Sequence, residues 1–443
     1  MSFLKPFLEV TEATPDRMAI WAPGHEPVSF IELRRLAASA QALCRENGVL
    51  PGDTVLMVDR PGPLLYASLI GTIATGACPL LVEPWISIRH IEAILEEMKP
   101  KAFFSSTLGK VLSLRIPAIR TIPHTIHPRT LLQHVRGSAL ELAPVRDDTP
   151  ALVTFTSSVD QPARAIVRSH GALARQLDAL SLALESRFSD APQLCLFTNT
   201  VLAQLLSGRS SLLMPQRWTS RAIRWLQNLP PALSPVAVHC SPGFLASVME
   251  LGPLPSLRKI HLSRAIADCA FLEKAFAHWP DAEFKCLYGS SEFEPLAWID
   301  AREAVKLSRG RGYIQTVALG APIAHLSGGA SSGVPGDRLE MSGGIWWYKG
   351  RVATKVQDFE LEQKIYHFLG STDCFLCRDA QDGLHLVGEN LKAAEDKLKQ
   401  EFPELQTAVD TPLVRDKRHR SWINRRKTLQ QGASWLLEGV TPS

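Results

Sequence analysis

The stretch from Gly52 to Val82 decides the fold class of the chain and reads GDTVLMVDRPGPLLYASLIGTIATGACPLLV. Its first seven residues end in an apolar run that predicts a buried strand, and a Pro-Gly-Pro turn at residues 61–63 stops that run. Residues 64–75 have the length and apolar content of a packed helix, and residues 78–82 form a second apolar run. A strand, a helix and a strand in this order predict a βαβ unit with parallel strands.

The same alternation extends on both sides of this unit. The spacing of apolar residues predicts helices at 29–48 and 86–98 and a short strand at 102–104, with a Ser29 cap and a Gly48 stop on the first helix. The rhythm returns as a strand at 151–156, a helix at 171–185, a strand at 194–198 and further units through Leu287. The sequence therefore predicts an α/β fold with two similar halves.

Beyond Gly350 the pattern changes. Strands are expected near residues 374 and 385, followed by a charged helix from about Glu389 to Phe402 and a basic tail. We expect a large N-terminal domain at 1–350 and a small α+β C-terminal lid at 351–443. The stretch 327–333, which reads SGGASSG, predicts a flexible surface loop.

Length and composition exclude several classes of protein. With 443 residues, about 150 per domain suggests roughly three domains. Hydrophobic residues make up 45% and charged residues 21%, which is typical of a globular chain and not of a disordered or fibrous one. A net charge of +4 makes neither nucleic acid nor an anionic membrane the expected partner. No apolar run approaches the ~18 residues of a membrane span, and the first residues lack a signal-peptide pattern, so we expect a cytoplasmic protein.

The eight cysteines are scattered, and most lie in apolar runs. Cys374 and Cys377 form a CxxC without a second pair or a His at zinc-ligand spacing. We expect reduced thiols that pack in the core.

Three segments that follow predicted strands carry residues able to bind a ligand, since parallel sheets bind ligands beyond the carboxyl ends of their strands. The first runs from Thr154 to Gln161 and on to Arg164, Ser169 and His170. Its hydroxyls and its cation could hold phosphate oxygens, but the same letters also suit a polar surface loop.

The second segment is Tyr288-Gly289-Ser290-Ser291-Glu292, which offers an aromatic ring for a base, hydroxyls for phosphate and a carboxylate for Mg²⁺. It could equally be a plain turn. The third pairs Gly336-Asp337 with Gly350-Arg351 around a Trp346-Trp347-Tyr348 strand. A carboxylate there can bind a ribose diol, and a hairpin with a solvated Asp and Arg would explain the same residues.

In this order the three segments resemble the acyl-adenylate-forming superfamily of AMP-dependent synthetases and ligases. The family's phosphate loop, T-S-G-[ST]-T-G-x-P-K-G-V followed by S-H, aligns without gaps on Thr156–Ile166 and Ser169-His170. Its Y-G-x-T-E motif resembles residues 288–292, and its S-P-x-x-L helix start resembles Ser241–Leu245. The segments 60–84 and 416–423 are similar to the β-lactone synthetases of bacterial olefin biosynthesis. The resemblance implies two α/β subdomains, a reduced β-barrel subdomain in the short interval between Glu292 and Asp337, and a C-terminal lid.

The resemblance also implies an activity and a role for each matching residue. It implies ATP- and Mg²⁺-dependent activation of a carboxylic acid as acyl-AMP, with transfer to CoA, to a carrier protein or to an internal hydroxyl. The resemblance places segments 194–214 and 236–249 along the acyl pocket, and their apolar residues then imply a hydrophobic acid. An acyl-carrier protein or a pathway enzyme is the expected partner. The implied roles are phosphate binding by Thr156, Ser157 and Arg164, adenine stacking by Tyr288 in its turn with Gly289 and Ser290, α-phosphate contact by Ser291, Mg²⁺ ligation by Glu292, ribose binding by Asp337, and contact with the ribose and the hinge by Arg351.

Several residues depart from the family pattern. Ser158, Val159, Asp160 and Gln161 replace residues of the phosphate loop, and Asp160 adds a negative charge there. The family's G-G-A-P segment beside adenine falls on residues 263–266, which read SRAI, and its catalytic Lys falls on Trp422. Nearby Arg420, Arg425 or Lys427 could supply a substitute cation.

Other interpretations remain open. His170 and His419 are expected to orient loops rather than to transfer protons. The basic tail is typical of a solvated lid face, although it could also bind CoA phosphates or RNA. The departures leave a second hypothesis, in which the chain is a catalytically impaired relative that binds a ligand or a partner, or performs only a transfer half-reaction.

Overall fold

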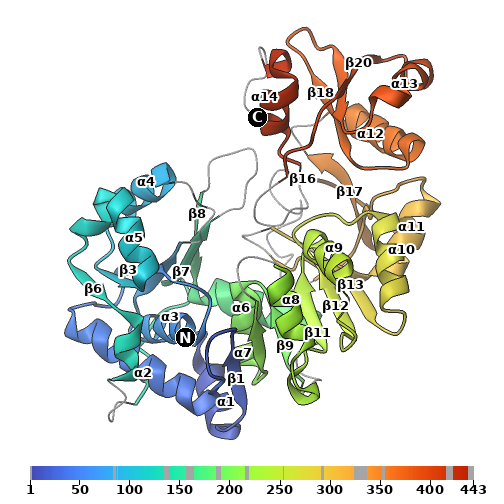
Figure 1. The fold of residues 1–443 in the computed structure, drawn as a ribbon. Helices are drawn as coiled ribbons and strands as arrows, with labels where there is room; N and C mark the ends of the chain where they lie inside the picture. The colour runs from blue at the N-terminus through green and yellow to red at the C-terminus, as the bar shows by residue number, and fades with distance from the viewer. Residues whose placement is uncertain are drawn as a thin grey trace. The chain divides into compact units, whose positions relative to one another are not determined.

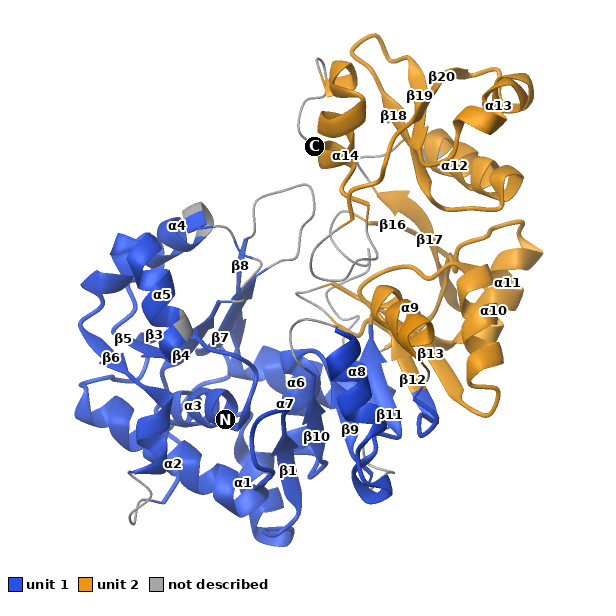
Figure 2. Ribbon diagram, in the orientation of Figure 1, with its two compact units in different colours: residues 1–157, 162–240, 254–259 blue, residues 158–161, 241–253, 260–443 orange. Residues whose placement is uncertain are grey.

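A computed structural model of the chain describes residues 2–82, 86, 88–133, 139–155, 164–185, 191–214, 219–252, 254–290, 294–323, 337–351, 355–415 and 423–437. The chain divides into two compact units (Figure 2). Unit 1 comprises residues 1–157, 162–240 and 254–259, and unit 2 comprises residues 158–161, 241–253 and 260–443. These two units do not test the domain boundary expected at residue 350, which stays a prediction.

The βαβ unit predicted from residues 52–82 is present in unit 1. Strands β3 (Thr54–Val58) and β4 (Cys78–Leu81) are parallel neighbours, and helix α3 (Pro63–Ala74) connects them. Helix α2 (Phe30–Glu46) begins at the predicted Ser29 cap, where a reciprocal capping box with Glu32 satisfies the first free N–H groups. Gly71 lets α2 and α3 approach closely, because a Cβ there would lie 2.3 Å from the Ala37 carbonyl oxygen.

These strands belong to a six-stranded sheet with the order β6-β5-β3-β4-β7-β8. Its pairs are parallel except for β7 with β8. One face packs against helix α4 and the segment that follows α5, in a cluster that includes Leu56, Leu80 and Ile94. The remaining elements of this layer are β5 (Ala102–Ser105), β6 (His124–Ile126), β7 (Pro150–Phe155), β8 (Ala165–Ser169), α4 (Ile88–Met98), α5 (Thr107–Arg115), η1 (Pro117–Thr121) and η2 (Pro128–Leu132).

A second group of strands in unit 1 has the order β11-β9-β10-β1-β2. Its pairs are parallel apart from β1 with β2. Its elements are β1 (Met18–Trp21), β2 (Val28–Ser29), β9 (Gln193–Cys195), β10 (Ser211–Leu213) and β11 (Ala237–Cys240), with α1 (Lys5–Ala13), α6 (His170–Ala183), α7 (Thr198–Leu206), α8 (Ser220–Gln227) and η4 (Pro231–Leu233). The first of the two predicted α/β halves thus lies in unit 1. The second half begins in unit 1 and continues into unit 2.

Unit 2 contains strands in the order β12-β13-β14-β15-β17-β16. From β13 onward the pairs are antiparallel, so the segment expected to form a reduced barrel is a run of antiparallel strands. Trp346, Trp347 and Tyr348 of β17 are buried in its core. The elements are β12 (Lys259–Leu262), β13 (Glu283–Tyr288), β14 (Ala297–Asp300), β15 (Ala318–Pro322), β16 (Asp337–Ser342), β17 (Ile345–Arg351), α9 (Pro242–Leu251), α10 (Cys269–His278) and α11 (Ala301–Gly310).

The C-terminal part of unit 2 is a small α+β module. A sheet of β18 (Cys374–Arg378), β19 (Leu384–Gly388) and β20 (Leu405–Asp410) has helices on both faces (Figure 1). Cys374 and Leu376 pack with α12 (Val356–Leu369) and α13 (Glu395–Glu401), whereas Phe375 and Cys377 pack with α14 (Arg425–Gly432) and η7 (Ser434–Leu437). The two cysteines of the CxxC therefore lie on opposite faces of the sheet; Cys374 is buried, Cys377 is half-buried, and both thiols are free.

One predicted boundary in this module is wrong. The charged helix begins at Glu395, after the short turn η6 (Lys392–Ala394), and not near Glu389. The Asp410 carboxylate accepts hydrogen bonds from the backbone N–H groups of Asn390 and Lys392, and Asn390 adopts φ +60°. These contacts hold the segment in a turn. Elsewhere the α/β class and the α+β C-terminal module are confirmed. In the described part of the chain, no helix has both the length and the apolar character needed to cross a membrane.

Candidate functional site

Three of the predicted site residues meet in unit 2. Tyr288 ends β13, Asp337 begins β16 and Arg351 ends β17. The Tyr288 hydroxyl donates a 2.9 Å hydrogen bond to Oδ2 of Asp337, and Nη1 of Arg351 lies 2.9 Å from Oδ1 of the same carboxylate. Asp337 and Arg351 face each other directly in the register of the β16–β17 hairpin. The hairpin and the end of β13 together make one polar cluster, which we call the Asp337 cluster.

Burial sets the electrostatics of this cluster. The Asp337 side chain is 9% exposed, and this burial raises the pKa of its carboxyl, although Arg351 and the Tyr288 hydrogen bond act in the opposite direction. Arg351 is 54% exposed, so its charge is largely solvated. Among the described residues, no donor is aligned for a hydrogen bond with Oδ1 of Asp337. Oδ1 is therefore paired with Arg351 by charge, and its second lone pair can accept a hydrogen bond from a ligand hydroxyl such as one of a ribose diol.

Aromatic side chains surround the cluster. The Tyr288 and Trp346 rings meet edge to face, with centroids 6.5 Å apart. Burial raises the pKa of Tyr348 to about 12, so its phenol stays neutral. The backbone N–H of Leu296 donates to the Tyr288 carbonyl at 2.7 Å and closes the loop that contains Gly289 and Ser290. Tyr288, the first residue of the predicted 288–292 motif, is therefore held at both its hydroxyl and its carbonyl group.

The segment that replaces the family's glycines holds a pair that the sequence did not reveal. Arg264 adopts φ +72°, a left-handed conformation that favours glycine. Its Nη2 lies 2.8 Å from Oε2 of Glu294, and the two side chains are 13% and 4% exposed. The only sequence signal for this contact was an Arg at a family glycine position, and nothing in the sequence pointed to Glu294.

Several predicted residues cannot be placed. Thr156, Ser157, Ser291 and Glu292 lie outside the described residues, as do the altered loop positions 158–161, the loop at 327–333, His419 and Trp422. Arg164 is described as an exposed residue directly before β8 in unit 1. The roles of these residues stay predictions.

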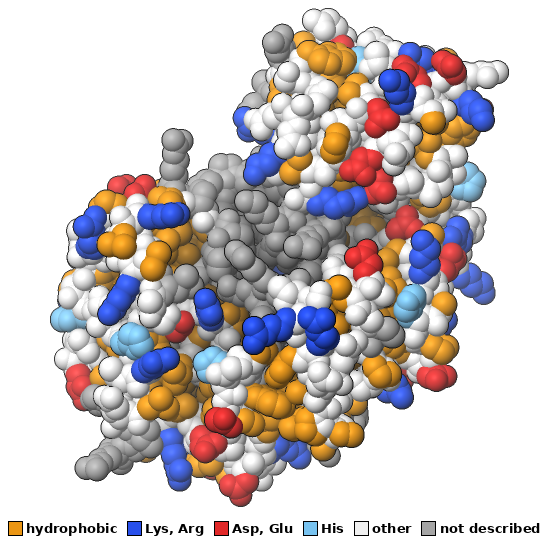
Figure 3. All heavy atoms as spheres, viewed as in Figure 1, with side chains coloured by type: hydrophobic (Ala, Val, Ile, Leu, Met, Phe, Trp, Pro, Cys, Tyr) orange, Lys and Arg blue, Asp and Glu red, His pale blue; other side chains and the backbone are white. Residues whose placement is uncertain are grey.

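The described part of the basic tail has acidic partners. Nη2 of Arg425 lies 3.1 and 3.3 Å from the two carboxylate oxygens of Glu362, and Arg415 pairs with Asp373. Glu362 is buried and also accepts hydrogen bonds from the Tyr366 hydroxyl and the Leu376 N–H. Arg425 therefore helps to hold α14 on the module. On the face shown in Figure 3, basic and acidic side chains are interspersed and form no single basic patch.

His170 does not show the hydrogen bonds expected of it. Its ring is fully buried beside Phe3 at the start of α6, and among the described residues neither ring nitrogen has a hydrogen-bond partner. Burial lowers its pKa from 6.5 to about 4, so the ring is neutral at physiological pH. A packing role fits these observations, and the expected hydrogen-bonding role does not.

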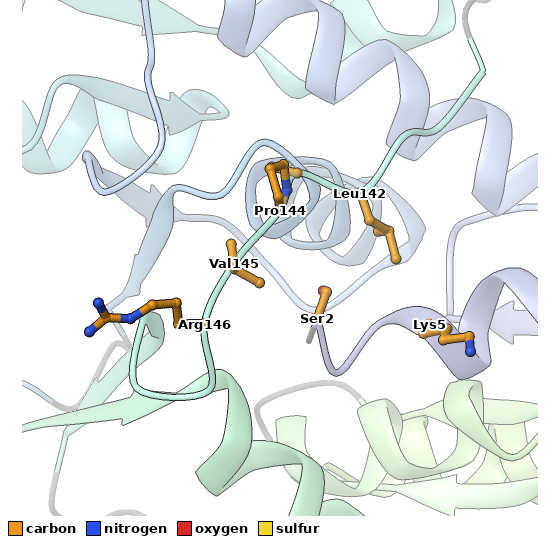
Figure 4. Close-up of a pocket in the computed structure, with 7 residues that line it drawn as sticks. Ser2, Lys5, Leu142, Pro144, Val145 and Arg146 are labelled. Carbon is orange, nitrogen blue, oxygen red and sulfur yellow. The ribbon is translucent and has the colours of Figure 1, made fainter.

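An open groove of about 520 Å³ in unit 1 lies apart from the predicted site residues (Figure 4). Apolar Leu142, Pro144 and Val145 line much of it, and the charged ends of Lys5 and Arg146 point away from one another at its two ends. Ligand sites have polar groups that converge on the ligand, and this groove lacks that feature.

The comparisons with known proteins agree on one family. Residues 7–325 match the family described as AMP-binding enzyme. An olefin beta-lactone synthetase of Xanthomonas campestris pv. campestris is 26% identical over 314 residues, which cover 65% of this chain and 56% of that protein. The protein of the same name from Stenotrophomonas maltophilia is 24% identical, over 67% of this chain and 58% of the relative. The chain thus matches little more than half the length of these relatives.

Solved structures show the same fold. ATP-bound MatB from Rhodopseudomonas palustris superposes with a TM-score of 0.75 at 13% identity, covering 98% of this chain and 100% of that one. VinN in complex with L-aspartate gives a TM-score of 0.62 at 16% identity, covering 77% of this chain and 84% of the other. The predicted family resemblance is confirmed: the chain belongs to the AMP-binding enzyme family.

Proposed function

We propose that the protein uses ATP to activate a carboxylic acid as acyl-AMP and releases pyrophosphate. The observation that carries this proposal is the Asp337 cluster, where a buried carboxylate acceptor, an aromatic ring and an arginine meet as a ribose and base site requires. In this reaction an oxygen of the substrate carboxylate attacks the α-phosphorus of ATP, and the bond to the β-phosphate oxygen breaks. Because the nucleophile is already anionic, the protein mainly has to align the two reactants and balance their charge.

The described residues can be given specific tasks in that reaction. Oδ1 of Asp337 would accept a hydrogen bond from a ribose hydroxyl, while Tyr288 keeps the carboxylate in place and presents its ring to the base. Arg351 would lie beside the ribose at the end of β17. The phosphate contacts would come from Thr156, Ser157, Arg164 and Ser291.

The magnesium assignment rests on the sequence. Among the described residues, no group of three or more His, Cys, Asp or Glu could hold a metal ion. Mg²⁺ in nucleotide sites needs only one or two carboxylates, since phosphate oxygens and water complete its coordination. Glu292 is the proposed carboxylate, and Mg²⁺ would supply neutralisation of phosphate charge.

The acid is proposed to be apolar, on the basis of the residues that the family uses for its acyl pocket. Phe197, Val201 and Leu205 are buried in unit 1, and Phe244 is buried in unit 2. A cytoplasmic location is part of the same proposal.

The names of the relatives favour one acceptor for the acyl group. Two of them are olefin beta-lactone synthetases, which supports an internal hydroxyl. For a 3-hydroxy acid, that oxygen would attack the acyl carbon of the adenylate, the bond to the phosphate oxygen would break, and AMP and a proton would leave. Transfer to CoA or to an acyl-carrier protein is the alternative, and a 24% match over 181 residues to a dimodular nonribosomal peptide synthase of Bacillus subtilis supports the carrier protein. An acyl-carrier protein or another enzyme of the same pathway is the proposed partner.

A second candidate function has observations of its own. Arg264 occupies a glycine position, Trp422 replaces the catalytic Lys, and Arg425, a candidate substitute for that Lys, contacts Glu362. These features favour an impaired relative that binds a ligand or partner, or that carries out only the transfer half-reaction.

The two functions can be separated by calorimetry with ATP and Mg²⁺, followed by pyrophosphate release with a panel of acids that includes 3-hydroxy fatty acids. Adenylation requires ATP binding and acid-dependent pyrophosphate release, and Glu292→Gln should abolish the release. Glu303→Gln, an exposed position on α11, is the matched control and should leave it unchanged. No ATP binding at millimolar concentration would overturn the proposal and leave the second candidate.

A further inference from the structure

The Arg264–Glu294 pair combines two unfavourable features in one place. Both side chains are largely buried, and removing a charge from water is unfavourable unless a partner compensates for it. Arg264 also adopts φ +72°, a left-handed backbone conformation that is strained for a residue other than glycine. Strain and buried charge of this kind concentrate at functional sites. The Arg264–Glu294 pair is therefore a candidate part of a binding site in unit 2.

The pair joins two segments that flank the Asp337 cluster. Arg264 follows the end of β12, and Glu294 lies in the loop between β13 and β14. That loop begins at Tyr288 and is closed by the Leu296 N–H to Tyr288 carbonyl hydrogen bond. Ile266, two residues after Arg264, packs against the same core cluster as Tyr288. The ion pair thus ties the turn that starts at Tyr288 to the end of the neighbouring strand.

We propose that Arg264 is a positioning residue of the nucleotide site, whose ion pair with Glu294 sets the plane in which Tyr288 meets the base. This inference rests on the proposed function, because it presupposes that the Asp337 cluster binds a nucleotide. In the family, glycines at this position bring the backbone close to the base. In this chain the Arg264–Glu294 ion pair would fix the position of the same segment beside the base. The base is the part of the nucleotide whose binding depends on this pair, whereas the phosphates bind elsewhere.

A pair that only stabilised the fold would behave differently. Its loss would reduce the folded fraction and would change the apparent affinity for every nucleotide by the same factor. A positioning role changes the ratio of affinities for different bases, since the base is the part of the nucleotide that meets Tyr288. The ratio of the dissociation constants for ATP and GTP is therefore the decisive measurement.

The experiment is calorimetry of the full chain with ATP and with GTP, each with Mg²⁺, alongside a melting curve for each variant. Arg264→Ala should weaken ATP binding about tenfold, equivalent to ~1.4 kcal/mol, and should change the ATP to GTP ratio about threefold or more. Glu294→Gln should act in the same direction, and Arg264→Lys should restore part of the ratio because it keeps the charge. Arg309→Ala is the matched control, since it removes the exposed Arg309–Glu273 ion pair of the same unit.

The outcomes separate this inference from the proposed function. If the wild type binds ATP and the Arg264 and Glu294 variants keep its ratio, the positioning role is overturned and the proposed function stands. If the wild type binds no nucleotide, both are overturned. Should Arg264→Ala fail to fold, Glu294→Gln decides the question, because it removes the charge while keeping the size of the buried side chain.

Discussion

The hydroxyl of Tyr288 donates to Oδ2 of Asp337 across 49 positions of sequence, at a distance of 2.9 Å. This bond joins the aromatic residue of one motif to the carboxylate of another, so the two motifs meet in one polar cluster. It also leaves Oδ1 to the ion pair with Arg351 and to the proposed contact with a ribose hydroxyl. The predictions below begin from this carboxylate.

Asp337→Asn should lower affinity for ATP and raise stability at neutral pH. The variant replaces a charged acceptor of the proposed ribose hydroxyl with a neutral amide. We therefore expect ATP binding to weaken about tenfold, which is the scale of one hydrogen bond with a charged group. Burial raises the pKa of the native carboxyl above 3.8, so the folded wild type loses stability as the pH rises through that raised value. The stability advantage of the variant should be full at pH 7 and should vanish below pH 3.8. Urea unfolding across this range measures it, and an advantage that grows in acid would contradict the burial argument.

Tyr288→Phe and Tyr288→Ala should separate the hydroxyl of Tyr288 from its ring. Phe keeps the stacking surface and removes the donor to Asp337, so we expect ATP affinity to fall by about 0.5–1.5 kcal/mol. Ala removes the ring as well, and a lost base stack adds about 1–3 kcal/mol. Calorimetry with ATP tests both variants. Equal losses for the two would show that the ring does not touch the base.

Gly320→Ala should destabilise unit 2 far more than Gly343→Ala. Both glycines adopt positive φ, but a Cβ on Gly320 would lie 2.1 Å from the Trp298 carbonyl oxygen, whereas no atom lies within 4 Å of a Cβ on Gly343. We expect about 1 kcal/mol from backbone strain at either position and about 1–3 kcal/mol more from overpacking at Gly320. Chemical denaturation of the pair gives the difference, and a similar loss for both would mean that β14 moves to accommodate the methyl group.

Glu362→Gln should destabilise the C-terminal module, and Arg425→Met should do so only slightly. The buried Glu362 carboxylate accepts hydrogen bonds from Tyr366, Leu376 and Arg425. Because an amide has only one acceptor oxygen, one of these donors would lose its partner, and we expect a loss of stability of about 1–3 kcal/mol. The Arg425 side chain is 41% exposed, so its ion pair contributes at most about 1 kcal/mol. Per folded molecule, pyrophosphate release should be unchanged in Arg425→Met. Loss of release in the folded variant would instead identify Arg425 as the substitute cation.

His170→Phe should remove a source of acid sensitivity. The folded-state pKa of His170 is lowered to about 4, so between pH 6.5 and that value the unfolded chain binds a proton that the folded chain does not. The wild type should therefore lose stability as the pH falls through this window, and the variant should lose less. Melting temperatures from pH 7 to pH 4 provide the comparison. Parallel curves for the two proteins would rule out His170 as the titrating group.

Local features of the fold were predictable because their determinants lie close together in the sequence. Ser29 and Glu32 specify the start of α2 through contacts three residues apart, and the apolar run at 54–58 specifies a buried strand. The start of α13 was not predictable in this way. It depends on Asp410, which holds the backbone of Asn390 from 20 positions away.

The same distinction between determinants that are close in sequence and those that are distant applies to the candidate site. The Asp337 cluster could be predicted from motifs, because a family pattern records which distant residues meet. The Arg264–Glu294 pair could not, since a left-handed backbone at an arginine and a contact across 30 positions leave no mark in a single sequence. His170 illustrates a third case, in which a polar ring expected to form hydrogen bonds is packed as an apolar one.

The β16–β17 hairpin makes the pairing of Asp337 with Arg351, and with it the proposed ribose contact, sensitive to changes in chain length. Asp337 and Arg351 stand opposite each other only because 13 residues of strand and turn keep them in register. Inserting or deleting one residue within that interval would turn one of the two side chains to the other face of the sheet, while every residue type in the motif remained intact. A relative with a hairpin of different length could thus carry every letter of the motif and still have no ribose site, which makes indels in this hairpin more informative than substitutions when activity is inferred across the family.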